Sequence, residues 1–435
     1  MAPRKFHLAW FSNFSLDEWQ QPFASGGGNP WNGRFHTEFA QALERACFDF
    51  MMLEDSLMLS EAYGGSTTHY LKHAIHVPKH DPVPLAAVIG SHTRHIGIVP
   101  TMSTLGYTPF LLARLAATID HITEGRFGWN IVTSAEKHAA QNFGLDRMVE
   151  HDARYDMADE FMDVVNALFD SWDPDAVVMD RDRHIYADAA KVRPINYKGK
   201  YYSSRGPLNT APSPQRRPTY VQAGGSPRGR DFAARHADCI VAAQVGVKSM
   251  KAFRDDIRER ARRFGRNPDD IKVLYLFAPV LGETEEEAIA KNTRSMMSEA
   301  YIERAVGMFS ALTDIDFSKF DLDKPLPELS TDGETTALKM FTQPGSGKPF
   351  RQLIREAGKA TCVDVVGTPE QVADRMAAIM DEVGGDGFLI KHPFHLINRR
   401  YIHEITDGLV PALQRRGLVR TEYTQPTLRE TLREF

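Results

Sequence analysis

Short runs of apolar residues recur along the chain and predict eight strands. Most of the runs are nearly continuous rather than alternating with polar positions. This pattern is typical of strands that are covered on both faces, and therefore of a parallel sheet. The runs occupy residues 5–11, 48–53, 96–100, 126–132, 219–222, 238–242, 272–280 and 387–390.

Amphipathic helices are predicted between the strands. Two helix starts carry capping signals, Thr368 with Pro369 and Gln371, and Thr284 with Glu287. The alternation of strands and helices predicts an α/β fold, and eight such units favour a closed (β/α)8 TIM barrel. The alternative is an open doubly wound sheet, but no G-x-G-x-x-G motif follows the first predicted strand. The clearest helix has an apolar face made by Tyr155, Ala158, Met162, Val165, Phe169 and Trp172.

Three segments are longer than ordinary connections between a strand and a helix. They lie near residues 12–31, 56–84 and 301–361. Long insertions in a barrel commonly build lids and substrate pockets. We therefore expect a single barrel domain over residues 1–435 with these three insertions.

Composition narrows the classes of function. The chain has 52 Lys and Arg residues, 57 Asp and Glu residues and a net charge of −5, so no polybasic face for nucleic acid is expected. Three widely separated cysteines imply no disulfide framework, which makes a reducing cytoplasm the expected location. No apolar stretch approaches the length of a membrane span, and the N-terminal apolar run is too short for a signal peptide.

The segment 123–134, T-E-G-R-F-G-W-N-I-V-T-S, carries the strongest signal for a binding site. Gly125 is placed to end a helix, the following apolar run is a strand, and the strand ends on the hydroxyl residues Thr133 and Ser134. Ligands of α/β proteins bind at this end of parallel strands. Asn130 puts an amide inside the apolar strand, where it needs a partner. The alternative is an ordinary core strand with a satisfied Asn130.

A second signal is the glycine-rich turn Q-A-G-G-S-P-R-G-R at residues 222–230. Ser226 suits a helix N-cap and Pro227 the first helical position, so backbone N–H groups and a hydroxyl would converge where glycines allow a ligand to approach. The turn is therefore a candidate phosphate cradle, which one of the two following arginines would reinforce. The alternative is a well-capped helix without a ligand.

Four histidines, His69, His73, His76 and His80, have spacing that raises the question of a metal site. No cysteine or acidic cluster follows at ligand spacing, and Pro78 and Pro82 interrupt the helix. We therefore expect a lid segment with hydrogen-bonded or solvated histidines, and no metal.

Two of these stretches, read with three others, resemble a known family. The segment 123–134, E-H-D-A-R-Y-D-M-A-D-E-F at 150–161, S-P-Q-R-R-P at 213–218, the turn at 222–230 and T-L-R-E-T-L at 427–432 resemble the luciferase-like flavin-dependent monooxygenases. Within that superfamily the similarity is to the branch of nitrilotriacetate, dibenzothiophene-sulfone and long-chain alkane monooxygenases. The resemblance extends over nearly the whole chain.

The resemblance implies a reaction and its cofactor. Reduced FMN, supplied by a separate NAD(P)H:flavin reductase, would react with O2 to a flavin C4a-peroxide, and one oxygen would enter a small organic substrate. A homodimer or homotetramer is expected. The rival hypotheses are a deazaflavin-dependent oxidoreductase, which transfers hydride without O2, and a non-catalytic flavin-binding protein.

The resemblance also implies site residues. His76 and Asn130 are the expected catalytic residues. Related alkane monooxygenases carry an amide at the position of His76, so the histidine departs from them and their substrates are not carried over. Ala135 stands where some relatives carry a histidine, so no catalytic histidine is expected there. The expected FMN-binding residues are Asp55, Ser103, Thr104, Asn130, Ser134, Tyr155, Ala223, Gly225 and Ser226.

Overall fold

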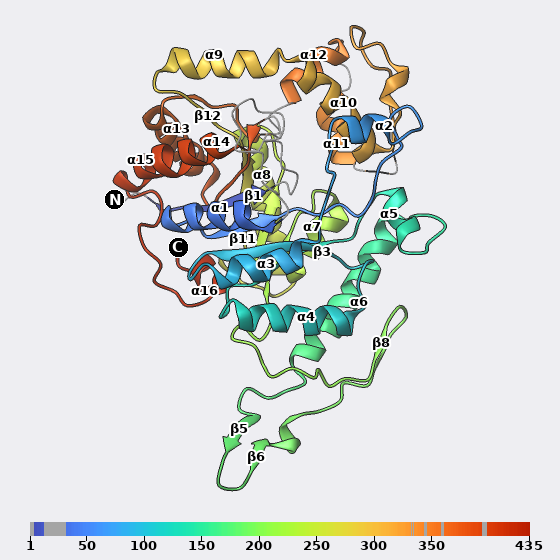
Figure 1. Ribbon diagram of the computed structural model, residues 1–435, viewed down its shortest axis with the longest axis vertical. Helices are drawn as coiled ribbons and strands as arrows, with labels where there is room; N and C mark the ends of the chain where they lie inside the picture. Colours follow the sequence, from blue (N-terminus) through green and yellow to red (C-terminus); the bar gives the residue numbers. More distant parts are fainter. Residues whose placement is uncertain are drawn as a thin grey trace.

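A closed barrel of eight parallel strands forms the centre of the protein (Figure 1). The computed structural model describes residues 4–12, 32–331, 333, 335–342, 346–357, 361–393 and 398–435. The strands follow one another in chain order around the barrel, and β1 closes it by pairing with both β2 and β14. Each strand overlaps one predicted apolar run, so the barrel prediction is confirmed. The strands are β1 (His7–Ser12), β2 (Phe50–Leu53), β3 (Gly97–Ser103), β4 (Gly128–Val132), β9 (Thr219–Gln222), β10 (Cys239–Ala242), β11 (Lys272–Phe277) and β14 (Gly387–Ile390).

Helices surround the barrel and bury its outer face. The predicted helix starts are confirmed, because Thr284 accepts a hydrogen bond from the Glu287 amide and Thr368 forms a capping box with Gln371. The helix with the apolar face ends at Phe169, so Trp172 lies beyond it. The surrounding helices are α1 (Arg34–Arg45), α3 (Pro82–Ser91), α4 (Pro109–Ile122), α6 (His151–Phe169), α7 (Pro227–His236), α8 (Val247–Arg263), α13 (Pro369–Val383), α14 (Arg399–His403), the π-helical turn η7 (Glu404–Leu409) and α15 (Val410–Arg415).

The interior of the barrel is packed with side chains rather than open. Ala9, Met52, Val221 and other inward-facing residues form this core. Helix α16 (Leu428–Leu432) adds Leu428 to it, and a Cβ at Gly97 would lie 2.5 Å from the Leu428 side chain. The C-terminal helix therefore fills one end of the barrel and leaves the other end for a site.

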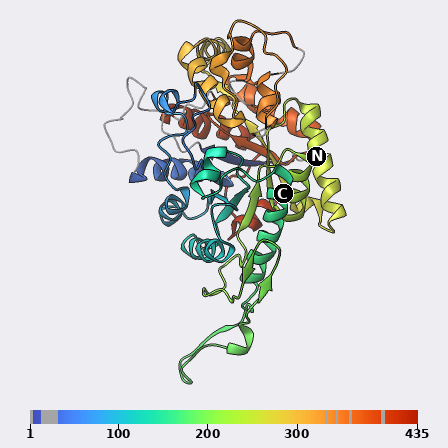
Figure 2. The same cartoon turned by 90° about the vertical axis from the view of Figure 1, so that its right-hand side faces the viewer.

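Two of the long segments pack together over the open end and are here named the cap. Residues 56–80 contain α2 (Thr68–Lys72), and residues 299–357 contain α10 (Glu299–Thr313), the short η5 (Phe317–Lys319), α11 (Thr335–Thr342) and α12 (Phe350–Ala357). In Figures 1 and 2, α2 lies beside these helices at one end of the molecule. Helix α9 (Glu285–Met296) and the pair β12 (Val280–Leu281) and β13 (Val366–Gly367) connect α10 and α12 to the barrel. The third segment, residues 12–31, lies outside the described residues apart from Ser12.

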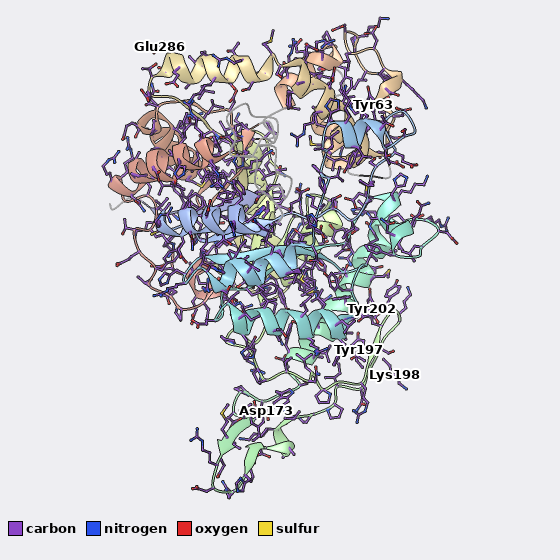
Figure 3. All side chains as sticks on the ribbon, in the orientation of Figure 1. Tyr63, Asp173, Tyr197, Lys198, Tyr202 and Glu286 are labelled. Carbon is purple, nitrogen blue, oxygen red and sulfur yellow. The ribbon has the colours of Figure 1, made fainter. Side chains whose placement is uncertain are left out.

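A further excursion, here named the arm, was not predicted. It spans residues 171–212 between α6 and β9 and contains β5 (Val177–Asp180), β6 (Ile185–Ala187), η3 (Ala189–Lys191), β7 (Tyr197–Lys198) and β8 (Ser203–Ser204). Figure 3 places Tyr63 in the cap at one end of the molecule and Asp173 in the arm toward the other end, with Tyr197 and Tyr202 between them. The arm therefore lies away from the capped end of the barrel. Throughout the described ranges, no helix has both the length and the apolar composition needed to cross a membrane.

Candidate active site

A cavity of about 470 Å³ lies between the cap and the C-terminal ends of the strands. All eight barrel strands contribute a residue at or just after these ends, among them Phe11, Thr101 and Leu276. The cap contributes Tyr70 and Met308. Both the volume and the location are those of a small-molecule site in a TIM barrel.

Most of the predicted site residues meet in this cavity, and Thr104 does not. Thr104 is buried, and its amide and hydroxyl point to the Val132 carbonyl at 3.0 and 3.4 Å. Its predicted contact with the flavin therefore has no support in the structure. The predicted site residues that line the cavity are Asp55, His76, Ser103, Asn130, Ser134, Tyr155, Ala223, Gly225 and Ser226.

The turn before α7 has the form of an anion cradle. Ser226 is the N-cap of α7, and its hydroxyl accepts a hydrogen bond from the Gly229 amide at 3.0 Å. A Cβ at Gly229 would lie 2.7 Å from the Tyr155 hydroxyl, so glycine is required for this close approach. Burial raises the pKa of Tyr155, which keeps its hydroxyl protonated and able to donate. Backbone and hydroxyl donors at a helix N-terminus suit a phosphate.

Two arginines serve this cradle in different ways. Arg230 donates from Nε to the Gly225 carbonyl at 2.9 Å and so supports the turn from behind, as expected, while its Nη1 pairs with Asp256. Arg228 pairs with Asp156 and Asp159, and neither of these two arginines lines the cavity. Arg154 lines the cavity instead. Its Nη1 donates to the Val149 carbonyl at 2.6 Å, while its buried Nε has no hydrogen-bond partner among the described residues. Arg154 therefore leaves a positive donor group at this end of the cavity.

Two buried amide oxygens face the cavity floor. Asn130 donates from Nδ2 to the Thr101 hydroxyl at 2.8 Å, which leaves Asn130 Oδ1 without a partner in the described structure. The same holds for Gln222 Oε1. Because buried acceptors need donors, a flat ligand with ring N–H groups fits this floor. Together with the cradle, the residues present fit the flavin mononucleotide expected from the sequence.

Hydroxyl residues continue this floor. The hydroxyls of Ser103 and Ser134 lie 2.8 Å apart at the ends of neighbouring strands. Ser134 has a positive φ of 52°, and His76 across the cavity has a φ of 51°. Such backbone conformations are uncommon for residues other than glycine and concentrate at functional sites.

Three ionisable residues, Glu54, His76 and Lys391, line the opposite side of the cavity. Lys79 does not line the cavity but pairs with Glu54, and these four residues are here named the charged wall. Glu54 lies 3.4 Å from Nδ1 of His76 and 3.1 Å from Nζ of Lys79. Burial lowers the pKa of His76 to about 4 and that of Lys391 to about 7. Although burial alone would raise the pKa of Glu54, the Lys79 ammonium brings it below its ordinary value. The imidazole is therefore neutral near pH 7, and Glu54 is charged.

Sequence reasoning found only His76 in this wall. Lys391 directly follows β14, and Asp55 closely follows β2. The argument that residues after barrel strands lie at the functional end therefore applied to Lys391 as much as to Asp55. Asp55 also lines the cavity, and burial raises its pKa to about 7. Glu54 and Lys79 gave no signal, because charged residues are usually solvated.

The four histidines do not converge. His69 Nε2 lies 2.7 Å from the Glu303 carbonyl, and His73 Nε2 lies 3.4 Å from the Glu303 carboxylate. Of this group only His76 lines the cavity. The described part of the chain holds no group of three or more His, Cys, Asp or Glu residues arranged to bind a metal ion.

Comparison with known proteins gives a consistent set of relatives. A model of the luciferase-like monooxygenase family matches residues 14–387. The chain is 36% identical over 400 residues to long-chain alkane monooxygenase of Geobacillus thermodenitrificans, covering 92% of this chain and 86% of that protein. It is 37% identical to nitrilotriacetate monooxygenase component A of Aminobacter aminovorans, covering 92% and 89%. A crystal structure of riboflavin lyase with modified FMN and riboflavin superposes with a TM-score of 0.87 at 32% identity, covering 99% and 96%.

Proposed function

The chain belongs to the luciferase-like monooxygenase family, and from this premise we propose that it is the oxygenase component of a two-component monooxygenase. It would bind reduced FMN and insert one oxygen atom of O2 into a small organic substrate. A relative whose name marks it as component A of a monooxygenase supports the two-component arrangement.

The observation that carries the proposal is that one cavity contains both a phosphate turn and unsatisfied ring acceptors. Gly225, Ser226 and Arg154 would hold the phosphate of FMN. Asn130 and Gln222 would accept hydrogen bonds from the ring. Bound reduced FMN would supply the electrons that activate O2.

The residues above this floor would shape the space for the substrate. Met308, Ala311 and Leu312 give the cap side of the cavity an apolar surface, which excludes water from the reacting groups. Glu54 beside Nδ1 of His76 favours the tautomer that carries the proton on Nδ1. Nε2 of the neutral imidazole is then free to accept a hydrogen bond from the substrate.

We infer a separate NAD(P)H:flavin reductase as the source of reduced FMN, since the sequence has no dinucleotide fingerprint after its first strand. We also propose a cytoplasmic location, a homodimer or homotetramer, and one barrel domain over the whole chain. The reductase partnership is transient, because the reduced cofactor diffuses from one protein to the other.

The test uses purified protein, FMN, NADH and an added flavin reductase. The protein should bind FMN more tightly than FAD, because the turn accepts one terminal phosphate. It should consume O2 only when the reductase is present, and reduced FMN should reoxidise more slowly when bound than when free. Robust NADH oxidation without reductase contradicts the two-component proposal. Substrate turnover with a reduced deazaflavin in the absence of O2 would favour the deazaflavin-dependent hypothesis. FMN binding without any substrate turnover would favour the non-catalytic hypothesis.

A further inference from the structure

Lys391 presents a buried amine to the cavity, and no group in the described part of the chain pairs with it. It follows β14 directly, and its backbone amide donates to the Phe277 carbonyl at 3.0 Å, which fixes its place at the strand end. The residue is 3% exposed and lines the cavity. Within the described ranges, its Nζ forms no hydrogen bond and no ion pair. A buried donor of this kind needs an acceptor from a ligand.

The neighbouring charges leave this amine in excess. Glu54 is the acidic group that acts on Lys391, but its two carboxylate oxygens already face Lys79 at 3.1 Å and His76 at 3.4 Å. Glu54 and Lys79 cancel, and His76 is neutral because it is buried. Burial raises the pKa of Asp55 to about 7, which favours its neutral form. The charged wall therefore carries one surplus positive charge when the Lys391 amine is protonated.

Apolar side chains line the cavity on both the barrel side and the cap side of this charge. Phe11 and Leu276 come from the barrel beside Lys391, and Met308 and Leu312 come from the cap. An occupant made only of hydrocarbon would satisfy these side chains but leave the amine buried without an acceptor. An occupant with an apolar body and one anionic end satisfies both surfaces.

We propose that Lys391 binds an anionic oxygen group of the substrate, so that the substrates of this enzyme are small organic acids with an apolar body. This inference rests on the proposed monooxygenase function and specifies its substrate class. Lys391 is then a substrate-binding residue, and Glu54 with Lys79 and His76 forms the polar surface beside the bound acid. Carboxylates and sulfonates both offer an anionic oxygen that can accept a hydrogen bond from the Lys391 amine.

The test compares three probes of one shape: phenylacetate, phenylmethanesulfonate and the neutral phenylacetamide. Each is titrated calorimetrically into the full-length protein loaded with oxidised FMN. At least one of the two anions should bind ten times or more tightly than the amide, and the stronger anion identifies the acid group. Lys391→Met and Lys391→Gln should abolish this preference, while Lys391→Arg should retain part of it. Lys137→Met is the matched control, because Lys137 is exposed on α5 (Lys137–Asn142) and should leave the preference unchanged.

Three results would overturn the proposal. The first is equal affinity for anions and amide in the unmodified protein, and the second is a preference that survives in folded Lys391→Met protein. The third is a loss of FMN affinity in Lys391→Met as large as the loss of probe affinity, which would assign the amine to the cofactor. If the unmodified protein binds no FMN, the proposed function fails instead, and the same titration on flavin-free protein still measures the anion preference.

Discussion

The hydroxyl of Ser226 has a capping role in the structure and a proposed role in phosphate binding, and two different measurements on one variant can test them. It caps α7 by accepting from the Gly229 amide at 3.0 Å, and it stands at the turn proposed to hold the FMN phosphate. Ser226→Ala removes the cap, which should lower the free energy of unfolding by about 1 kcal/mol and Tm by about 1–2 °C. It also removes a phosphate contact of about 1–2 kcal/mol, so Kd for FMN should rise roughly 5- to 30-fold.

Thr368→Ala is the matched control for this prediction. Thr368 caps α13 in the same way, with Pro369 following and a 3.4 Å hydrogen bond from the Gln371 amide, but it does not line the cavity. It should lower Tm by a similar amount and leave FMN affinity unchanged. Titration of FMN fluorescence and thermal unfolding measure both quantities. If Ser226→Ala lowers Tm but binds FMN as tightly as the unmodified protein, the turn is only a helix start and our placement of the phosphate is wrong.

Three further predictions concern the cavity and the assembly. His76→Ala should divert oxygen from substrate to hydrogen peroxide while FMN affinity stays nearly constant and chelators have no effect; normal coupling would place His76 outside the reaction. Burial raises the pKa of Asp55 from 3.8 to about 7, so the folded state favours its protonated form. The free energy of unfolding should therefore fall as pH rises from 4 through 7. In flavin-free Asp55→Asn protein, the free energy of unfolding should fall less steeply with pH, as measured by thermal unfolding. An unchanged dependence on pH would contradict the raised pKa of Asp55. We expect a dimer or tetramer whose interface uses barrel helices near β4. Sedimentation measures the mass of the assembly, and a monomer at micromolar concentration would contradict this prediction.

The sequence predicted the barrel because its strands are buried on both faces. Burial of this kind produces continuous apolar runs in the sequence, such as the run that contains β4. The order of the strands then follows from the order of these runs along the chain, because the barrel is closed. The arm escaped prediction for the opposite reason. Its strands are only two to four residues long, and apolar residues in them, such as Val178, Met179 and Tyr186, are exposed rather than buried, so they do not give the longer buried runs that mark the barrel strands.

The site was predictable where local chemistry determines it. The turn that contains Gly225 and Ser226, which we propose holds the phosphate, can be recognised from the nine residues 222–230, and Asn130 is conspicuous inside an apolar strand. Ser103 is the last residue of β3, and Thr104 comes directly after it. The Thr104 side chain is turned toward the Val132 carbonyl of the neighbouring strand, and this orientation cannot be read from the sequence of β3 alone. The pairing of Glu54 with Lys79 needed the fold, because residues 56–80 must turn back over the barrel before the two side chains meet.

The cap has its own hydrophobic core, and this separation has a consequence for amide exchange. Tyr70, Ile75, Phe309 and Ile354 pack into a cluster distinct from those of the barrel. Contacts such as the 2.8 Å hydrogen bond from the Gly64 amide to Asp316 join the two cap segments to each other. Cap amides should therefore exchange with deuterium as one cooperative unit, ahead of the barrel strands. A molecule held between cap and barrel would slow that exchange, so exchange mass spectrometry offers a way to recognise substrates before any product is known.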